Sequence, residues 1–122
     1  MSELTTLLAA EEAVVAAARA RTLPPELRLL SAQAGTRVAA LRAELARANQ
    51  APPRTRGGRV GLESALERAI AAAYAAVQTL DDERTLRVVA RVMAGDGQSL
   101  ALLRMAMNRS PSPDALETGK AP

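Results

Sequence analysis

Apolar side chains recur every three or four residues in four separate segments of this chain, with residues that favour turns between them. This spacing places the apolar residues on one face of an α-helix, so it predicts four amphipathic helices. The predicted helices span about residues 3–21, 25–48, 62–79 and 82–107. Pro24 and Pro25 separate the first two, because a proline disfavours the helical conformation of the residue before it. Asp81 is expected to cap the N-terminus of the fourth.

The composition favours an all-α fold in a single domain. Alanine accounts for 28 of the 122 residues, whereas Tyr74 is the one aromatic residue. Strands draw on β-branched and aromatic side chains, and alanine is depleted in them. A chain of this length forms one hydrophobic core. We therefore expect a four-helix bundle over residues 1–109, followed by a C-terminal tail over residues 110–122.

The segment between the second and third predicted helices, residues 50–61, is too long for a tight turn. It is rich in proline and glycine, and it carries Arg54, Arg56 and Arg59 without an acidic residue. About a dozen extended residues reach roughly 36–40 Å, whereas a 20-residue helix is about 30 Å long. The segment can therefore cross the whole bundle. The expected topology is two antiparallel helical hairpins joined by a long crossover linker.

The absence of histidine and cysteine excludes several kinds of chemistry. Disulfides, thiol nucleophiles, zinc fingers and histidine acid–base catalysis all need one of these residues. The 16 basic and 13 acidic residues give a net charge of +3, well below the basic surface of a dedicated DNA-binding domain. No stretch approaches the uninterrupted apolar length of a membrane span, and the first residues show no signal-peptide pattern. We therefore expect a cytoplasmic protein that does not bind a membrane.

Two acidic residues interrupt the apolar stripes of the predicted helices. Glu11 lies seven residues after Leu4 in the first helix, and Asp96 occupies a position of the fourth that Leu, Val and Met otherwise fill. Counted from the turns, both lie near the middle of the bundle. An ionised carboxylate persists in a core only with partners. Alternatively, these acids lie at the edge of the stripe, solvated or paired with arginine.

A neighbouring flank of the third predicted helix carries Glu63, Glu67 and Tyr74. Glu67 lies at about the same distance from its turn as Asp96 does, so it belongs to the same level of the bundle. The pattern allows either glutamate to reach the interior. Three acids and a tyrosine would then converge on one central layer.

Three short segments of the chain have counterparts in a known family. Residues 36–42 read TRVAALR, residues 94–104 read AGDGQSLALLR and residues 112–119 read SPDALETG. They are similar to the segments EHVAALR, ADEAQHLAALR and P-D-A-F-x-x-G of small ferritin-like domains of unassigned function from actinobacteria. The resemblance implies a ferritin-like four-helix bundle, in which carboxylates and histidines on the four helices hold two metal ions.

The resemblance also implies which residues stand at the ligand positions. Glu11 matches the ligand of the first helix, Glu67 that of the third, and Asp96 the glutamate of the fourth. The remaining ligand positions hold Ala34, Arg37 and Ser99. Half of the ligand set is therefore replaced. We expect no cofactor, and we interpret the three acids as the remains of an iron or manganese site.

A guanidinium is available to replace the metal. If Arg37 points inward, it places a fixed cation among the acids, and arginine pairs well with buried carboxylates. One arginine does not neutralise three acids, so at least one carboxyl is expected to be protonated or bound to water. The hypothesis is a metal-free core ion network in which Glu63, Tyr74 and Ser99 also take part.

These observations leave three functions open. The first is a catalytically silent structural or interaction protein that forms a homodimer or binds a protein partner. The second is a residual metalloprotein whose carboxylates bind a cation such as iron or manganese. The third is a weak nucleic-acid-associated factor that uses the arginines of residues 50–61, although no aromatic residue accompanies them for base stacking. The lost ligands favour the first.

Overall fold

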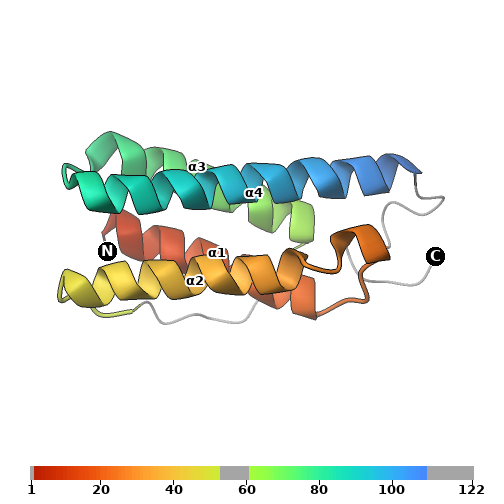
Figure 1. Ribbon diagram of the computed structural model, residues 1–122, viewed down its shortest axis with the longest axis horizontal. Coiled ribbons are helices and arrows are strands. Elements are labelled where there is room, and N and C mark those ends of the chain that lie inside the picture. The colour runs from red at the N-terminus through yellow and green to blue at the C-terminus, as the bar shows by residue number, and fades with distance from the viewer. Residues whose placement is uncertain (1, 53–60, 110–122) are drawn as a thin grey trace.

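A computed structural model describes residues 2–52 and 61–109. It contains α1 (Glu3–Arg19), a short 3-10 helix η1 (Pro25–Leu27), α2 (Leu30–Arg47), α3 (Leu62–Thr79) and α4 (Glu83–Arg109) (Figure 1). Within those two ranges there is no strand. The prediction of an all-α four-helix bundle is confirmed. The predicted tail over residues 110–122 and most of the predicted linker lie outside the described residues.

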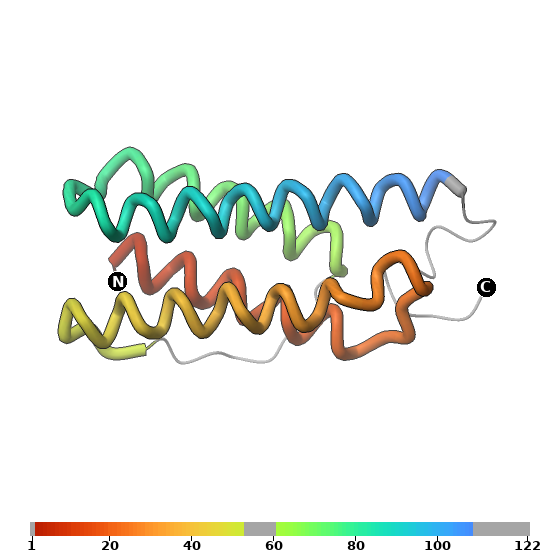
Figure 2. Tube along the Cα trace, in the orientation of Figure 1, coloured from red at the N-terminus to blue at the C-terminus, as the bar shows by residue number. Residues whose placement is uncertain are grey.

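The four helices form two antiparallel hairpins that pack side by side. The trace in Figure 2 runs along α1 and back along α2, and then along α3 and back along α4. The C-terminus of α2 and the N-terminus of α3 lie at opposite ends of the bundle (Figures 1 and 2). The connection between the hairpins therefore joins opposite ends, as the length of residues 50–61 predicted.

Two of the predicted helix starts are wrong. The second helix does not begin at Pro25: that residue opens the 3-10 turn η1, and α2 starts only at Leu30. The fourth helix is not capped by Asp81, because Asp82 accepts the first helical hydrogen bond, from the backbone N–H of Leu86 at 2.9 Å. Asp82 also accepts from the hydroxyl of Thr85 at 2.6 Å. The two adjacent aspartates are equivalent as caps by residue type, so the pattern could not distinguish them.

The core consists of two apolar clusters, one toward each end of the bundle. The first cluster lies near the N-termini of α2 and α3 and holds buried residues of the ranges 14–18, 27–34, 62–69 and 100–106. The second lies near the N-termini of α1 and α4 and holds buried residues of the ranges 4–8, 38–45, 73–76 and 89–92. On α1, α2 and α4 the gap between the two clusters coincides with Glu11, Arg37 and Asp96. A polar layer therefore divides the core at its middle.

Small residues line the helix that packs most closely on α1. The buried face of α3 is dominated by alanine: Ala65, Ala69, Ala73 and Ala76 are all at most 1% exposed. Of the neighbouring helix pairs, α1 and α3 contact each other most extensively and α2 and α4 least. Alanine side chains allow two helix axes to come near the lower end of the usual 8–10 Å range.

The buried stripe of α4 is shifted by one residue from the predicted one at several positions. The sequence pattern favoured Leu86, Met93 and Met107, but these side chains are only half-buried. Thr85, Val92 and Ala106 are buried in their place. The interior thus takes the smaller residue of each adjacent pair. None of the described helices is long and apolar enough to cross a membrane.

The close packing of α1 and α3 yields a first prediction. Replacing Ala69 by Leu adds three carbon atoms at a fully buried position, so we expect the free energy of unfolding to fall by about 1–3 kcal/mol. The matched control is Ala75→Leu, at an exposed position of the same helix, which we expect to change it by less than about 0.5 kcal/mol. Urea unfolding followed by circular dichroism measures both. Equal effects of the two substitutions would show that α1 and α3 are not in close contact.

Candidate functional site

Three charged side chains from three helices meet in the polar layer. Glu11 of α1 and Asp96 of α4 are completely buried, and Arg37 of α2 is 8% exposed. The Nε of Arg37 lies 3.0 Å from Oδ1 of Asp96 and 3.4 Å from Oε1 of Glu11. The prediction that Glu11 and Asp96 converge at mid-bundle around an inward Arg37 is confirmed. The alternative, in which they lie solvated at the edge of the stripe, is wrong.

A glycine on α4 makes room for the guanidinium. A Cβ atom built on Gly95 would lie 3.1 Å from Nη1 of Arg37 and 3.2 Å from its Cδ, so the arginine packs directly over the backbone next to Asp96. Gly97, on the other side of Asp96, has nothing within 4 Å of such a Cβ. The two glycines that flank the aspartate thus differ: the first admits Arg37 and the second faces open space.

The layer holds more acid than base, and this sets its protonation. The pKa of Glu11 is raised to about 9, chiefly by burial and then by the neighbouring carboxylate of Asp96, against the lowering effect of Arg37. Burial also raises the pKa of Asp96, while Glu11 and Arg37 oppose that shift. At neutral pH Glu11 therefore carries a proton and Asp96 balances the charge of Arg37. This agrees with the expectation that one carboxyl is protonated.

Ser99 lies one turn beyond Asp96 on the same face of α4 and is 3% exposed. The structure thus buries Ser99 but does not include it in the ion network, although it was predicted to belong there. Within the described ranges, no hydrogen bond joins its hydroxyl to Glu11, Arg37 or Asp96. Ser99 therefore borders the layer without bonding to it.

Three residues predicted for the central layer lie on the outside of the bundle instead. Tyr74 is 60% exposed, and the side chain of Glu67 is 52% exposed. Glu63 and Glu67 both pair with Arg104 of α4, at 3.1 Å and 3.4 Å. The inward face of α3 includes Leu62, Leu66 and Ala73, which lie one position before Glu63, Glu67 and Tyr74. The predictions that Glu67 reaches the central layer and that Glu63 and Tyr74 belong to the core network are therefore wrong, whereas the reading of Glu67 as the remnant of a metal ligand stays a prediction.

A second polar network, which the sequence analysis missed, joins α2 to the start of α4. Arg47 donates through Nη2 to Oε2 of Glu44 at 2.8 Å, to Oδ2 of Asp82 at 2.6 Å and to the Thr85 hydroxyl at 2.8 Å. Glu44 is only 6% exposed. Hydrogen bonds from Thr85 and then from Arg47 lower the pKa of Asp82 to about 2. The available signal was that Glu44 follows Arg37 by seven residues, two turns along the same face of the helix.

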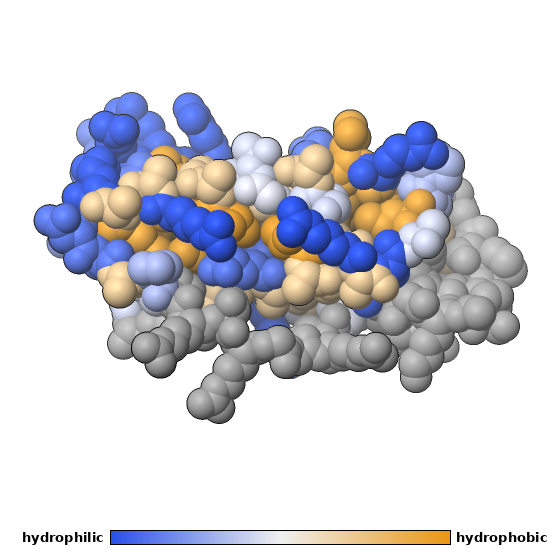
Figure 3. Space-filling model, turned by 90° about the horizontal axis from the view of Figure 1, so that it is seen from below, coloured by the Kyte–Doolittle hydropathy of each residue, from blue (hydrophilic) through white to orange (hydrophobic). Residues whose placement is uncertain are grey.

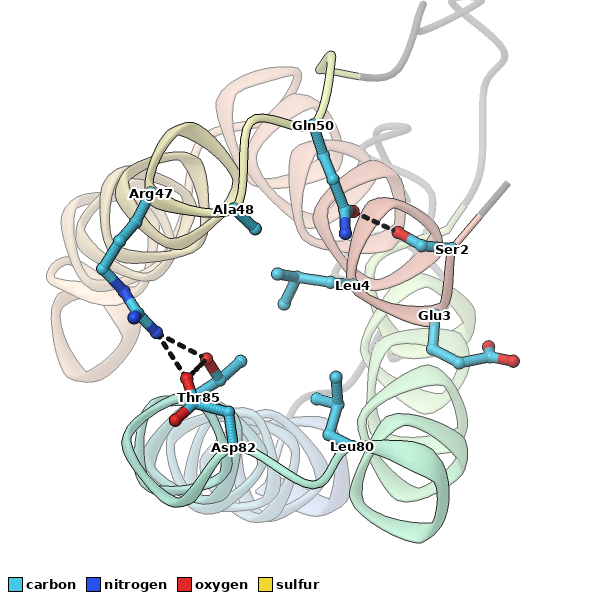
Figure 4. Close-up of a pocket in the computed structure, with 9 residues that line it drawn as sticks. All are labelled: Ser2, Glu3, Leu4, Arg47, Ala48, Gln50, Leu80, Asp82 and Thr85. Atoms are coloured by element: carbon cyan, nitrogen blue, oxygen red, sulfur yellow. Dashed lines mark hydrogen bonds and ion pairs between the residues drawn. The ribbon is translucent and has the colours of Figure 1, made fainter.

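A pocket lies at this end of the bundle. It has a volume of about 420 Å³ and opens to the solvent. Leu4 and Leu80 form its apolar wall, and Glu3 points away from it (Figure 4). Across the opening, the Ser2 hydroxyl donates to the Gln50 amide oxygen at 2.6 Å, and Arg47 bonds to Asp82 and Thr85. These polar groups satisfy one another, which indicates a structural role.

Polar side chains are distributed unevenly over the surface. In the space-filling view, hydrophilic residues gather at the end where α2 terminates and α4 begins, and apolar and polar side chains alternate along the rest of that face (Figure 3). The large apolar side chains that are most exposed are Leu29, Tyr74, Val77, Leu102 and Met105. Arg54, Arg56 and Arg59, the basis of the nucleic-acid alternative, lie outside the described residues.

The layer offers few groups for metal chemistry. In residues 2–52 and 61–109, no cluster of three Asp, Glu, His or Cys side chains is placed to hold a metal ion. Glu11 and Asp96 are two carboxylates with a guanidinium beside them, and this charged neighbour disfavours a divalent cation. The donor set does not fit an iron or manganese centre of the ferritin-like kind.

Comparison with known proteins finds no match to any family model, curated protein or solved structure.

The protonation of Glu11 predicts how stability depends on pH. Its pKa is about 9 in the folded chain against an ordinary value of 4.5 for an exposed glutamate, so between these values the folded state holds a proton that the unfolded state has released. The contribution of this proton to the free energy of unfolding is complete below about pH 4.5 and is lost as the pH rises toward 9. Glu11→Gln mimics the protonated carboxyl, and we expect it to be more stable than the wild type at pH 8 by an amount on the order of a few kcal/mol.

Urea unfolding at intervals from pH 5 to pH 9 measures this effect. The control is Glu12→Gln. Glu12 is the residue after Glu11 and forms an outward ion pair with Arg42. We expect this variant to keep the wild-type dependence of the free energy of unfolding on pH. If the free energy of unfolding of Glu11→Gln depended on pH as steeply as that of the wild type, the assignment of the proton to Glu11 would be contradicted.

The contrast between the two glycines gives a matched pair of variants. Gly97→Ala adds a methyl group in open space and improves helix propensity, so we expect the free energy of unfolding to rise by up to about 1 kcal/mol. Gly95→Ala gains the same propensity but pushes against Arg37, so we expect that gain to be lost or reversed. Thermal and urea unfolding of both variants measure the difference. Equal stabilisation would show that Arg37 does not pack over α4.

Proposed function

We propose that this protein is a catalytically silent helical bundle of the ferritin-like type that acts as a structural or interaction protein. The observation that carries the proposal is the position of Arg37, whose Nε lies within 3.0–3.5 Å of oxygen atoms of both Asp96 and Glu11. A guanidinium thus takes the place that a metal ion would need. The proposal also rests on the resemblance of residues 36–42 and 94–104 to segments of that family.

The burial of the layer supports a role without catalysis. Glu11 and Asp96 are completely buried, so a substrate would have to enter the core to reach them. A catalytic group must come within about 2.6–3.2 Å of the atom on which it acts. In the end pocket, the polar side chains of Ser2, Arg47 and Thr85 already bond to neighbours. These features favour a bundle whose charged groups fix its structure.

The exposed apolar side chains support association with another protein. Leu29 is 68% exposed, Tyr74 60% and Met105 53%. Tyrosine and methionine are enriched at interfaces between proteins. We propose that the bundle forms a homodimer, with binding to a different protein as the other outcome. The proposed location is the cytoplasm.

Metal titration and a mass measurement on one sample test the proposal. We expect the melting temperature to stay constant on addition of Mn²⁺ or Fe²⁺ to the purified protein, because a ligand stabilises a fold only when it binds the folded state. Elemental analysis is expected to find no stoichiometric iron or manganese, and light scattering is expected to give the mass of a dimer. A melting temperature that rises with metal concentration would overturn the metal-free centre. A monomeric mass without any captured partner would overturn the interaction role.

A further inference from the structure

The polar layer has hydrogen-bonding capacity that the described side chains leave unused. Oε1 of Glu11, Nη2 of Arg37 and both carboxylate oxygens of Asp96 are buried, and within the described residues none of them makes a hydrogen bond of good geometry. Oε1 of Glu11 and Oδ1 of Asp96 face the charge of Arg37 as ion pairs through Nε, which leaves Nη2 and most of the oxygen lone pairs unused. The three side chains come from three helices, and each is more than nine-tenths buried. Buried polar groups in proteins are nearly always hydrogen-bonded, to the protein or to ordered water. Four such atoms in one layer therefore indicate a bound group.

The residues that border the layer are small. The boundary between the two apolar clusters falls on α3 between Ala69 and Ala73, and α3 contributes no buried titratable side chain. On α4, Gly95 lacks a side chain and Ser99 is short and buried. The apolar clusters above and below are filled by leucines, including Leu7, Leu41 and Leu103. The layer thus combines polar atoms with short neighbours, which are the conditions for an internal water molecule.

The charges of the layer decide what kind of group can bind. It must accept a hydrogen bond from the Arg37 guanidinium and donate one to the Asp96 carboxylate. A metal ion or an ammonium group would face the positive charge of Arg37, and an anion would face Asp96. Water is neutral, is small, and both donates and accepts. It also bonds well to two or more buried groups at once.

We propose that the layer formed by Glu11, Arg37 and Asp96 is a binding site for an internal water molecule. The water accepts a hydrogen bond from Nη2 of Arg37 and donates to a carboxylate oxygen of Asp96 and to the carboxyl oxygen Oε1 of the protonated Glu11. It completes the hydrogen bonds of the charged groups and links α1, α2 and α4 at the middle of the bundle. Because the site is enclosed, the water exchanges slowly with the solvent.

Magnetic relaxation dispersion of ¹⁷O and ²H in the solvent water detects such slowly exchanging molecules. We expect a long-lived water contribution in the wild type. It is expected to persist in the control Glu12→Gln/Arg42→Met, which removes an ion pair on the outside of the same two helices. It is expected to disappear in Glu11→Leu/Arg37→Met/Asp96→Leu, in which the layer is apolar.

The absence of long-lived water in the wild type would overturn the proposal, and so would its persistence in the folded triple variant. If the triple variant does not fold, a high-resolution crystal structure of the wild type decides. Density within about 2.7–3.2 Å of Nη2 of Arg37 and of an Asp96 oxygen supports the site, and its absence overturns it. Anomalous scattering from a metal at that position would overturn both this site and the proposed function, whereas a dry layer without metal overturns this site alone.

Discussion

The pairing of Arg37 with two buried acids is the constraint on which the rest of this bundle depends. A guanidinium does not lose its charge at any physiological pH, so it remains in the core only if a carboxylate faces it. Asp96 supplies that charge at 3.0 Å, and Glu11 carries a proton because its pKa is raised to about 9. The layer is neutral as a whole. Removing either Arg37 or Asp96 would leave an uncompensated buried charge, which typically costs about 3–5 kcal/mol.

Both polar networks join the first hairpin to the second. Arg37 of α2 contacts Asp96 of α4. Arg47 of α2 contacts Asp82 and Thr85 at the N-terminus of α4. Arg47 lies ten residues after Arg37, and Thr85 lies eleven residues before Asp96, so the contacts keep one register along the antiparallel pair. This pair packs least closely of the neighbouring helices. Polar contacts therefore fix the α2–α4 interface, whereas alanine packing fixes the one between α1 and α3.

The helices, the crossover and the buried pair could be predicted because each depends on a strong local pattern. Glu11 and Asp96 replaced apolar residues at helical spacing, and Arg37 was placed opposite them through a family resemblance. The position of Glu67 could not be predicted from the pattern. On α3 the inward and outward faces are one residue apart in the sequence, and alanine occurs on both faces, so the apolar residues do not show which face is buried. Glu44 and Thr85 were missed for a related reason: each is a polar residue whose burial depends on a partner from the other hairpin.

The polar layer is better explained by specificity than by stability. Apolar residues of similar volume often stabilise a core as well as a buried ion pair does, or better. Alanine-rich helices, however, present nearly uniform surfaces, and such surfaces define the rotation and register of their neighbours poorly. The guanidinium of Arg37 must meet Asp96 and packs over Gly95, so the layer favours arrangements of α2 and α4 that bring these three residues together. The buried charges thus determine which of many similar packings the chain adopts.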